Sequence, residues 1–320
     1  MQELRRRVLS AVADGPVTGP ALAETLDVSR AAVWKHVEAL REAGFDIAGT
    51  DDGYVLESVP EFGGAAVEFG LEAPYEVEYH DTIPSTNDRA RELAAEGSEN
   101  VVVLADSQSG GRGRLDRPWT SPSGSVLLSI LFRPTLPPNQ VPIVTLAAAV
   151  ATTTAAREAG VPAGIKWPND VLVPAAESER EAGDPESGGY KLAGILTEME
   201  GEADRVSWVV PGIGVNANVP LESLPDTATS LQAEVGPVDR RTFTQVLLER
   251  FHDLAGDPEA VLPAWREQAT TLGQRVRVET PGGEVVGEAV DIEFPGVLVV
   301  ETETGRERVT AGDCEHLRPA

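Results

Sequence analysis

The chain has 320 residues, 41% of them hydrophobic, with 52 acidic residues against 26 basic ones. This length predicts two or three domains, each able to bury a core. The single cysteine, Cys314, excludes an internal disulfide, and the polar start of the chain lacks the pattern of a signal peptide. We therefore expect a cytoplasmic protein in a reducing compartment. The most apolar run, residues 141–156, is short and rich in threonine, which favours a buried helix over a membrane span.

The formal net charge of −26 is the second compositional feature. A compact chain with this charge repels itself unless salt screens the repulsion. Only Lys35, Lys166 and Lys191 are lysines, and all other basic residues are arginines. This composition favours a halophilic protein, with an acidic protein that recruits a basic partner as the alternative. Because arginine does not replace a compact, mobile ammonium group, each remaining lysine is a candidate for a specific role.

The first 58 residues predict a winged helix-turn-helix domain. Apolar residues recur at helical spacing in residues 4–14, and a second short helix follows at 20–28. Ser29 is placed to cap a third helix, which Gly44 ends. Two short strands around an Asp-Gly turn complete the pattern. The third helix is the element that would enter the major groove of DNA.

The rest of the chain predicts a linker and two further domains. Residues 59–74 are rich in proline and glycine, which is typical of a linker. Strands and helices alternate through residues 75–272, where residues 174–190 lack apolar periodicity and carry five acidic residues against one arginine. That segment predicts an acidic surface insertion. Residues 273–320 contain four or five short strands with glycine-rich turns, which predict a small barrel. The predicted fold class is α+β.

Residues 110–119, "GGRGRLDRPW", place Arg112, Arg114 and Arg117 within six positions of an otherwise acidic chain. The glycines let backbone amides approach a ligand closely, and guanidinium groups bind phosphate or carboxylate. Trp119 offers a flat face for a ring. The loop therefore predicts an anion-binding site, with a solvated surface turn as the alternative.

The remaining candidate residues follow in three motifs. Lys166 precedes Asn169 and Asp170 in "KWPND", which a simple turn would also explain. Lys191 opens the alternating strand "KLAGILTEME", and Asn216 ends the strand "PGIGVN". Two lysines, three arginines and no histidine do not form a pattern for nucleophilic catalysis or for zinc. They indicate electrostatic positioning of a phosphate-bearing intermediate.

Five motifs in this order resemble those of biotin–protein ligases. They are "STN" at 85–87, Gln108 with "RGR" at 112–114, "KWPND" at 166–170, "KLAGIL" at 191–196 and "GIGVN" at 212–216. The N-terminal domain resembles that of the bifunctional type, which is also the biotin operon repressor. The resemblance covers nearly the whole chain apart from residues 174–190. It implies a central mixed-sheet α/β ligase domain similar to class II synthetases, followed by an SH3-like barrel.

The resemblance also implies residue roles. Biotin is expected to contact eight residues: Ser85, Thr86, Asn87, Gln108, Arg112, Gly113, Arg114 and Lys191. The nucleotide is expected to contact Arg117, Trp119, Lys166, Asp170 and Asn216, with Trp119 stacked on adenine. For Lys166, Asp170 and Asn216, contact with the metal or with the incoming lysine is the alternative. Lys191, Arg114 and Lys166 are the expected catalytic residues, and no metal ligands are assigned. Ser85 or Thr86 is also placed to cap the following helix. Asp116 departs from the small residue usual in this family, and it is placed to pair with Arg114 or Arg117.

The implied chemistry has two steps. The biotin carboxylate attacks the α-phosphate of ATP, with Mg²⁺ spreading the charge, and biotinyl-5′-AMP and pyrophosphate form. A lysine of a biotin carboxyl carrier protein or domain then attacks the acyl carbon. The protein's contribution in such chemistry is mainly positioning and charge stabilisation.

The charges of the N-terminal domain give evidence both for and against DNA binding. Residues 1–41 hold six basic and five acidic residues, and the expected DNA contacts are Ser29, Arg30, Lys35 and His36. Against this, Asp51 and Asp52 lie at the tip of the wing. The resemblance implies operator DNA as a partner and a homodimer when the adenylate is bound. A winged helix that serves only as a dimerisation or regulatory module is the alternative.

Two other functions compete with the ligase hypothesis. A lipoate- or octanoyl-transferring relative shares the fold, but the Arg-Gly-Arg loop and "KWPND" resemble the biotin branch. A non-catalytic transcription factor would use biotin or its adenylate only as a corepressor. Retention of Lys166, Lys191 and Asn216 in a lysine-poor chain favours catalysis, because ligand sensing alone does not require ATP handling.

Overall fold

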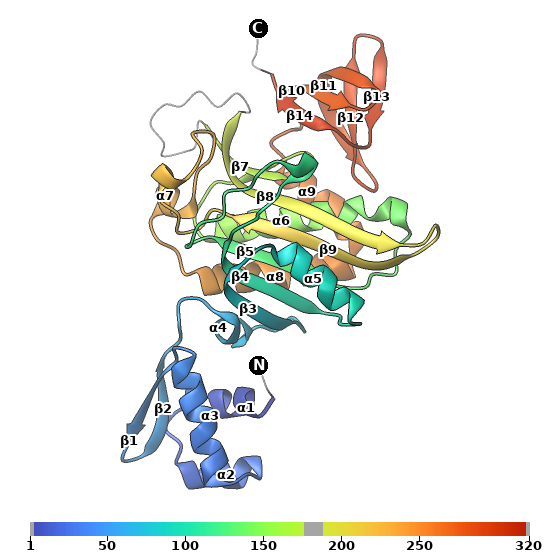
Figure 1. Ribbon diagram of the computed structural model, residues 1–320. Coiled ribbons are helices and arrows are strands. Elements are labelled where there is room, and N and C mark those ends of the chain that lie inside the picture. Colours follow the sequence, from blue (N-terminus) through green and yellow to red (C-terminus); the bar gives the residue numbers. More distant parts are fainter. Residues whose placement is uncertain (1–2, 176–187, 318–320) are drawn as a thin grey trace. The chain divides into compact units, whose positions relative to one another are not determined.

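The structure, a computed structural model, describes residues 3–175 and 188–317 (Figure 1). Most of the predicted acidic insertion at 174–190 lies outside the described residues. The chain divides into two compact units, residues 1–79 and 80–320. Among the described residues, no helix is long and apolar enough to cross a membrane.

The first unit contains the predicted winged helix-turn-helix. Its elements are α1 (Glu3–Ala13), α2 (Gly19–Leu26), α3 (Arg30–Glu42), β1 (Asp46–Thr50) and β2 (Gly53–Ser58). Ser29 caps α3 as predicted, because its hydroxyl accepts a hydrogen bond from the Ala32 amide at 3.2 Å. Val8, Val33 and Leu40 are fully buried where the three helices meet. The helix-turn-helix prediction is confirmed.

The segment predicted to be a linker is more ordered than its composition indicates. It contains a short helix, α4 (Gly64–Glu68), in which Ala66 and Val67 are buried. Phe69 packs edge-on against Phe45 of the helix-turn-helix core, with ring centroids 6.2 Å apart. The segment therefore packs within the first unit, because its apolar residues find partners that proline and glycine content does not reveal.

A seven-stranded sheet forms the centre of the second unit. In spatial order its strands are β3 (Glu76–Ile83), β4 (Val101–Gln108), β5 (Val126–Leu131), β9 (Val206–Val215), β8 (Gly189–Gly201), β7 (Asp170–Pro174) and β6 (Gly164–Lys166). From β4 to β6, neighbouring strands pair antiparallel. The long β8–β9 pair brings the "KLAGIL" and "GIGVN" motifs side by side, since Gly194 is paired with Gly214.

Helices cover both faces of this sheet. Helix α5 (Thr86–Ala95) lies on one face, where its Ala90 and Leu93 pack with Leu127 and Leu131 of β5. The other face carries α6 (Pro142–Glu158), α8 (Arg240–Gly256) and α9 (Val261–Gln268), as Figure 1 shows. The apolar run at 141–156 is thus the buried helix that the sequence predicts. A short helix, α7 (Leu231–Val235), follows β9.

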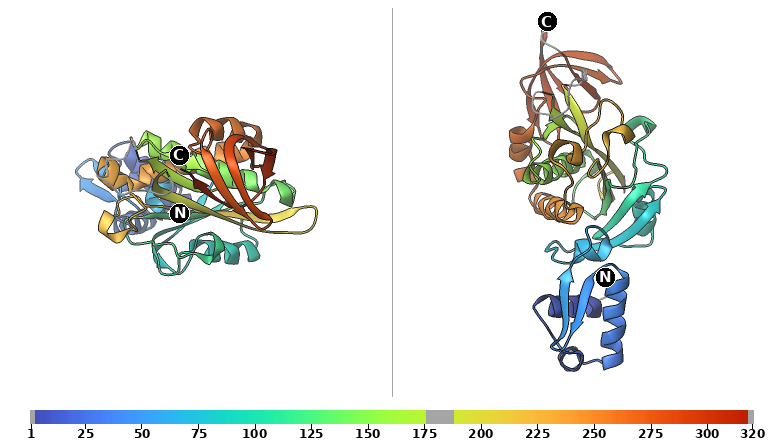
Figure 2. Two further views of the ribbon diagram at one scale, coloured as in Figure 1. Left: turned by 90° about the horizontal axis from the view of Figure 1, so that it is seen from above. Right: turned by 90° about the vertical axis from the view of Figure 1, so that its left-hand side faces the viewer.

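The C-terminal part is a five-stranded antiparallel sheet (Figure 2). Its strands are β10 (Arg275–Thr280), β11 (Gly283–Glu293), β12 (Val297–Thr302), β13 (Gly305–Val309) and β14 (Asp313–His316). The order β13-β12-β11-β10-β14 agrees with the four or five short strands that the sequence predicts. Trp167 joins this sheet to the central one, because its indole donates a hydrogen bond to the Gly296 carbonyl at 3.0 Å. The α+β class is confirmed.

Candidate functional site

One cavity collects residues from all five sequence motifs. Its wall includes twelve of the thirteen residues predicted for biotin or the nucleotide: Ser85, Thr86, Asn87, Gln108, Arg112, Gly113, Arg114, Arg117, Trp119, Asp170, Lys191 and Asn216. These residues come from the start of α5, the end of β4, the arginine loop, β7, β8 and the end of β9. The fold therefore brings together side chains that are more than one hundred positions apart in the sequence.

The start of α5 supplies hydroxyl and amide groups. Ser85 caps this helix, because its hydroxyl accepts from the Asp88 amide at 3.2 Å. The Thr86 backbone amide and hydroxyl both donate to Gln108 Oε1, at 2.6 and 3.1 Å. The resulting arrangement places neutral donors and acceptors at this end of the cavity.

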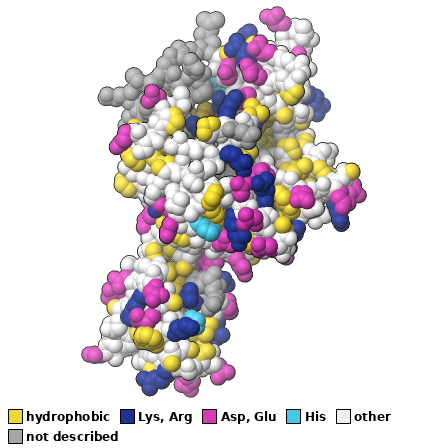
Figure 3. All heavy atoms as spheres, in the orientation of Figure 1, with side chains coloured by type: hydrophobic (Ala, Val, Ile, Leu, Met, Phe, Trp, Pro, Cys, Tyr) yellow, Lys and Arg dark blue, Asp and Glu magenta, His cyan; other side chains and the backbone are white. Residues whose placement is uncertain are grey.

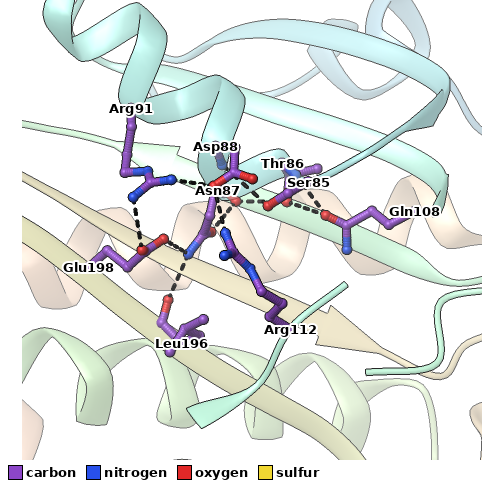
Figure 4. A network of polar contacts seen from close by, with 10 residues as sticks. Ser85, Thr86, Asn87, Asp88, Arg91, Gln108, Arg112, Leu196 and Glu198 are labelled. Carbon is purple, nitrogen blue, oxygen red and sulfur yellow. Dashed lines mark hydrogen bonds and ion pairs between the residues drawn. The ribbon is translucent and has the colours of Figure 1, made fainter. Parts of the chain in front are cut away.

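Asn87 is held by groups from two strands, β8 and β5 (Figure 4). Its Nδ2 donates to the Leu196 carbonyl at 3.2 Å and to Glu198 Oε2 at 2.7 Å, both on β8. Its Oδ1 accepts from the Ser129 hydroxyl of β5 at 2.6 Å. On β9, Gly212 leaves the necessary room, since a Cβ there would lie 2.0 Å from Asn87 Oδ1. The Asn87 amide is thus engaged by the protein on both of its polar atoms.

The arginine loop is held on two sides. Arg112 pairs with Asp88 of α5 at 2.7 Å. Arg114 donates to Asn169 Oδ1 at 2.8 Å and to the Gly312 carbonyl at 2.5 Å. Arg117 pairs with Asp313 of β14 at 2.6 Å. The predicted pairing of Asp116 with Arg114 or Arg117 lies outside the described residues.

The surface around the loop mixes both charges. In Figure 3, basic side chains of the second unit stand next to acidic ones on the face that is visible. The ion pairs Arg91–Glu198 at 3.4 Å and Arg112–Asp88 at 2.7 Å are examples of this arrangement. Exposed pairs of this kind contribute little to the free energy of unfolding, but they fix the direction in which each guanidinium points.

Lys191 and Trp119 lie next to each other, and the Trp119 ring packs against two glycines of the sheet. Lys191 Nζ is 2.7 Å from Asp170 Oδ1 and 5.3 Å from the centroid of the Trp119 ring. The indole lies against Gly194 and Gly214, where a Cβ at Gly214 would come within 2.6 Å of its Nε1. Ring, ammonium and carboxylate therefore occupy one part of the cavity wall.

Of the residues predicted for the nucleotide, Asn216 lines the cavity and Lys166 does not. Asn216 is buried and donates to the Thr229 carbonyl at 3.0 Å, so it also braces the chain after β9. Lys166 does not line the cavity. Its charge acts instead on His316, whose pKa is lowered to about 4, first by burial and then by the nearby Lys166 ammonium. Lys166 and Asp170 are paired across β6 and β7, and the spacing of "KWPND" did not reveal that only Asp170 lines the cavity.

Sequence reasoning missed two residues that hold the site together, Ser129 and Glu198. Ser129 is fully buried beneath the start of α5, and Glu198 lies on β8 in the cavity wall. The only signal in the sequence is the pair of acids, Glu198 and Glu200, at the end of the apolar alternation of "KLAGILTEME". Their contacts with Asn87 span 42 and 111 positions, which a local pattern does not encode.

The residues predicted for DNA lie on or beside α3. Arg30 and Lys35 are exposed, and the Ser29 side chain is used for the helix cap. His36 is half-buried, and burial together with the charges of Arg5 and Lys35 lowers its pKa. Trp34 is 58% exposed on the same helix. The first half of α3 therefore exposes two basic side chains and one aromatic side chain, those of Arg30, Lys35 and Trp34.

Comparisons with known proteins match three consecutive parts of the chain. A family model described as "HTH domain" matches residues 5–55. The model of the "Biotin/lipoate A/B protein ligase family" matches residues 79–216, and that of the "Biotin protein ligase C terminal domain" matches residues 271–317. Fold and cavity thus define a protein of the biotin/lipoate ligase class that carries a helix-turn-helix domain.

Curated relatives narrow this class. The chain is 36% identical over 317 residues to the bifunctional ligase/repressor BirA of Bacillus subtilis, with 93% of each chain covered. It is 27% identical to the protein of the same name from Escherichia coli, covering 93% of this chain and 92% of that one. A solved biotin protein ligase from Aquifex aeolicus, in complex with biotin and ATP, has a TM-score of 0.60 at 24% identity, covering 75% of this chain and 98% of that one. The chain belongs to the family of bifunctional biotin–protein ligases and biotin operon repressors.

Proposed function

We propose that this protein is an ATP-dependent biotin–protein ligase that also acts as a biotin-responsive transcriptional repressor. The observation that carries the proposal is the assembly of twelve predicted ligand residues in one cavity wall. We assign the winged helix-turn-helix to residues 1–58, the linker to 59–74, the ligase chemistry to 75–272 and the C-terminal barrel to 273–320.

Biotin binds with its ureido head at the start of α5 and its carboxylate toward Lys191. Thr86 and Gln108 supply the neutral hydrogen-bonding groups that a ureido ring needs. Lys191 supplies the positive charge that a carboxylate needs, although it is paired with Asp170 in this structure. Arg112 and Arg114 close over the ligand from the loop. A polar end and a cationic end in one cavity match the two ends of biotin.

The nucleotide binds where the arginine loop, Trp119 and Asp170 meet. The biotin carboxylate oxygen attacks the α-phosphorus of ATP, the bond to the β-phosphate oxygen breaks, and pyrophosphate leaves. Lys191 and the loop arginines reduce the repulsion between carboxylate and phosphate as they approach. Trp119 offers its ring for adenine. The protein acts by positioning and charge, since no nucleophilic side chain is required.

Mg²⁺ suits this site as an ion that arrives with ATP. Among the described residues there is no group of three or more His, Cys, Asp or Glu side chains that could hold a metal alone. Mg²⁺ is commonly bound by one or two carboxylates together with substrate phosphates, and Asp170 in the cavity wall is such a carboxylate. The ion supplies positive charge to the phosphates during displacement.

The second step transfers biotin to a carrier. The ε-amino group of a lysine in a biotin carboxyl carrier protein attacks the acyl carbon, and the bond to the AMP oxygen breaks. The amine loses a proton and AMP leaves with the bonding electron pair. Closure of the arginine loop protects the mixed anhydride from water until the carrier lysine arrives.

The repressor role uses the first unit. Arg30 and Lys35 are exposed on α3, the helix that enters the major groove in proteins with this motif. A homodimer formed when the adenylate is bound would present two such helices to operator DNA. Asp51 and Asp52 are exposed in the turn of the wing, so we expect the recognition helix to supply the base contacts.

The charge of the chain favours a halophilic setting. With a formal charge of −26, the protein works best where salt screens self-repulsion. We place it in the cytoplasm, without a membrane partner. Cys314, the only cysteine, is buried, and burial raises the pKa of its thiol to about 12, so it is not a reactive thiol.

A two-stage assay tests the proposal. The protein is incubated with biotin, ATP and Mg²⁺ in molar KCl, and pyrophosphate is measured before and after a carrier domain is added. We expect a pyrophosphate burst without carrier and a carrier mass increase equal to one biotin. Lys191→Ala is the matched inactive variant. Binding of biotin without pyrophosphate would favour the non-catalytic sensor, and activity with lipoate in place of biotin would favour the lipoate-type ligase.

A further inference from the structure

The hydrogen-bond chain from Glu198 to Thr86 has a direction. Asn87 Nδ2 faces the Leu196 carbonyl and a Glu198 carboxylate oxygen, and both of these groups are acceptors only. The amide nitrogen must therefore point toward β8, which leaves the amide oxygen to face Ser129. The shorter of the two contacts, 2.7 Å against 3.2 Å, is the one to Glu198. A charged acceptor also makes the stronger hydrogen bond.

This orientation decides which way the Ser129 hydroxyl points. Ser129 Oγ is 2.6 Å from Asn87 Oδ1 and 2.8 Å from Thr86 Oγ1, and it has a single hydrogen. Because the amide oxygen carries no hydrogen, Ser129 donates to Asn87. Thr86 then receives no hydrogen from Ser129. Its own hydrogen is directed to Gln108 Oε1, 3.1 Å away, or to Ser129 Oγ.

Thr86 consequently presents acceptor lone pairs at the cavity wall. If the Asn87 amide were reversed, its Nδ2 would donate to Ser129, and the Ser129 hydrogen would turn toward Thr86 Oγ1. That hydrogen would occupy one of the two lone pairs of Thr86 Oγ1 and leave a single one for a ligand N–H group. Thr86 is 4% exposed and Ser129 is fully buried, so water does not substitute freely for either partner.

We propose that Glu198 is a positioning residue for biotin recognition: through Asn87 and Ser129 it keeps Thr86 Oγ1 as an acceptor for a ureido N–H. Arg91 supports Glu198 from α5, with Nη1 3.4 Å from Glu198 Oε1. Figure 4 shows Glu198, Asn87 and Thr86 in one row across β8 and the start of α5. The inference rests on the proposed biotin site and adds a residue that acts on the ligand through Asn87, Ser129 and Thr86.

A double-mutant cycle tests the inference. Biotin dissociation constants are measured by calorimetry for the full chain, Glu198→Ala, Thr86→Val and the double variant. We expect Glu198→Ala to weaken biotin binding about tenfold, the scale of one hydrogen bond to a charged group. In the Thr86→Val background, the same change should weaken binding by less than about twofold, because its target is already gone.

Glu200→Ala is the matched control on the same strand. Glu200 accepts a hydrogen bond from the Trp208 indole at 3.1 Å and does not line the cavity. Its removal should leave the biotin dissociation constant unchanged. An equal loss on Glu198→Ala in both backgrounds, no loss in either, or a loss of the same size on Glu200→Ala would each overturn the inference.

The remaining outcomes are also decisive. If Glu198→Ala does not fold, Glu198→Gln is used, since it keeps the size of the side chain while presenting either a donor or an acceptor to Asn87. A smaller loss that again disappears in the Thr86→Val background supports the inference, and a loss independent of Thr86 contradicts it. If the unmodified protein binds no biotin, the proposed function itself fails, which separates the two results.

Discussion

Arg114 shows how one side chain connects distant parts of the ligase. Its guanidinium bonds Asn169, 55 positions away, and the Gly312 carbonyl, 198 positions away. It thereby fastens the arginine loop to the turn after β6 and to the segment before β14. Among the described side chains, the neighbouring Arg117 pairs with Asp313, and its own side chain is 63% exposed. Removal of Arg114 should therefore loosen the arginine loop more than removal of Arg117.

We predict that Arg114→Gly increases the rate at which the adenylate dissociates. Loss of two hydrogen bonds made by a charged group loosens the loop, so biotinyl-5′-AMP should dissociate at least about tenfold faster. The measurement is the rate at which preformed, labelled adenylate appears in a filtrate. Arg117→Gly, which removes an exposed pair, should change this rate by less than about threefold. Release from Arg114→Gly at the rate of the unmodified protein would contradict the prediction.

At the scale of elements, glycines on β8 and β9 shape the cavity floor. A Cβ at Gly212 would overlap Asn87, and a Cβ at Gly214 would overlap the Trp119 indole. Each glycine thus allows a side chain from a different segment to reach the sheet surface. The motif "GIGVN" consequently has a steric reason: both of its glycines lie beneath residues that the ligand is proposed to meet or depend on.

His316 links β14 to the segment between α9 and β10. Its Nε2 is 3.0 Å from Thr271 Oγ1, and this hydroxyl oxygen also accepts from the Trp167 amide at 2.9 Å. His316 is buried, which lowers its pKa to about 4, with the Lys166 charge as the second cause. The contact between the two sheets therefore depends on a neutral imidazole.

The pH dependence of unfolding tests this element. Between pH 6.5 and about 4 the unfolded chain binds a proton at His316 that the folded chain does not, so the free energy of unfolding decreases as pH falls. The full contribution is up to about 3 kcal/mol. Denaturant titrations of the unmodified protein and of His316→Gln should diverge in this window. Acidic groups with lowered pKa values, such as Asp106, contribute to both proteins equally, and parallel curves would refute the prediction.

In the whole molecule, the net charge and the charges of the cavity wall have opposite signs. The formal charge is −26, yet the cavity wall contains Lys191 and three arginines. Acidic partners such as Asp88, Asp170 and Asp313 hold these cations in place. The bulk charge therefore acts on the stability of the fold, while the local cations act on anionic ligands.

We predict that salt stabilises the folded chain. Raising KCl from 0.1 to 2 M shortens the Debye length from about 10 Å to less than 3 Å, which screens repulsion among the 52 acidic residues. The midpoint of thermal unfolding should rise by at least about 5 °C, roughly 2 kcal/mol for a domain of this size. Calorimetric scans at several KCl concentrations measure this midpoint. A midpoint that falls with salt would show that ion pairs outweigh the repulsion.

Local patterns in the sequence determined the elements of this protein. The caps at Ser29 and Ser85, the buried helix at 142–158 and the strands carrying "KLAGIL" and "GIGVN" all follow from spacing and turn chemistry. The five motifs also indicated which residues would share a site. These features depend on interactions between residues close in sequence, or on motifs whose order is visible in the chain.

Only the tertiary structure decided what each side chain contacts. It placed Lys166 outside the cavity wall, engaged the Asn87 amide with β5 and β8, and brought Glu198 and Ser129 beneath the start of α5. It also packed Phe69 of the expected linker against Phe45. Such contacts span tens to hundreds of positions, and their energies depend on burial and direction, which exist only once strands pair and helices cover the sheet.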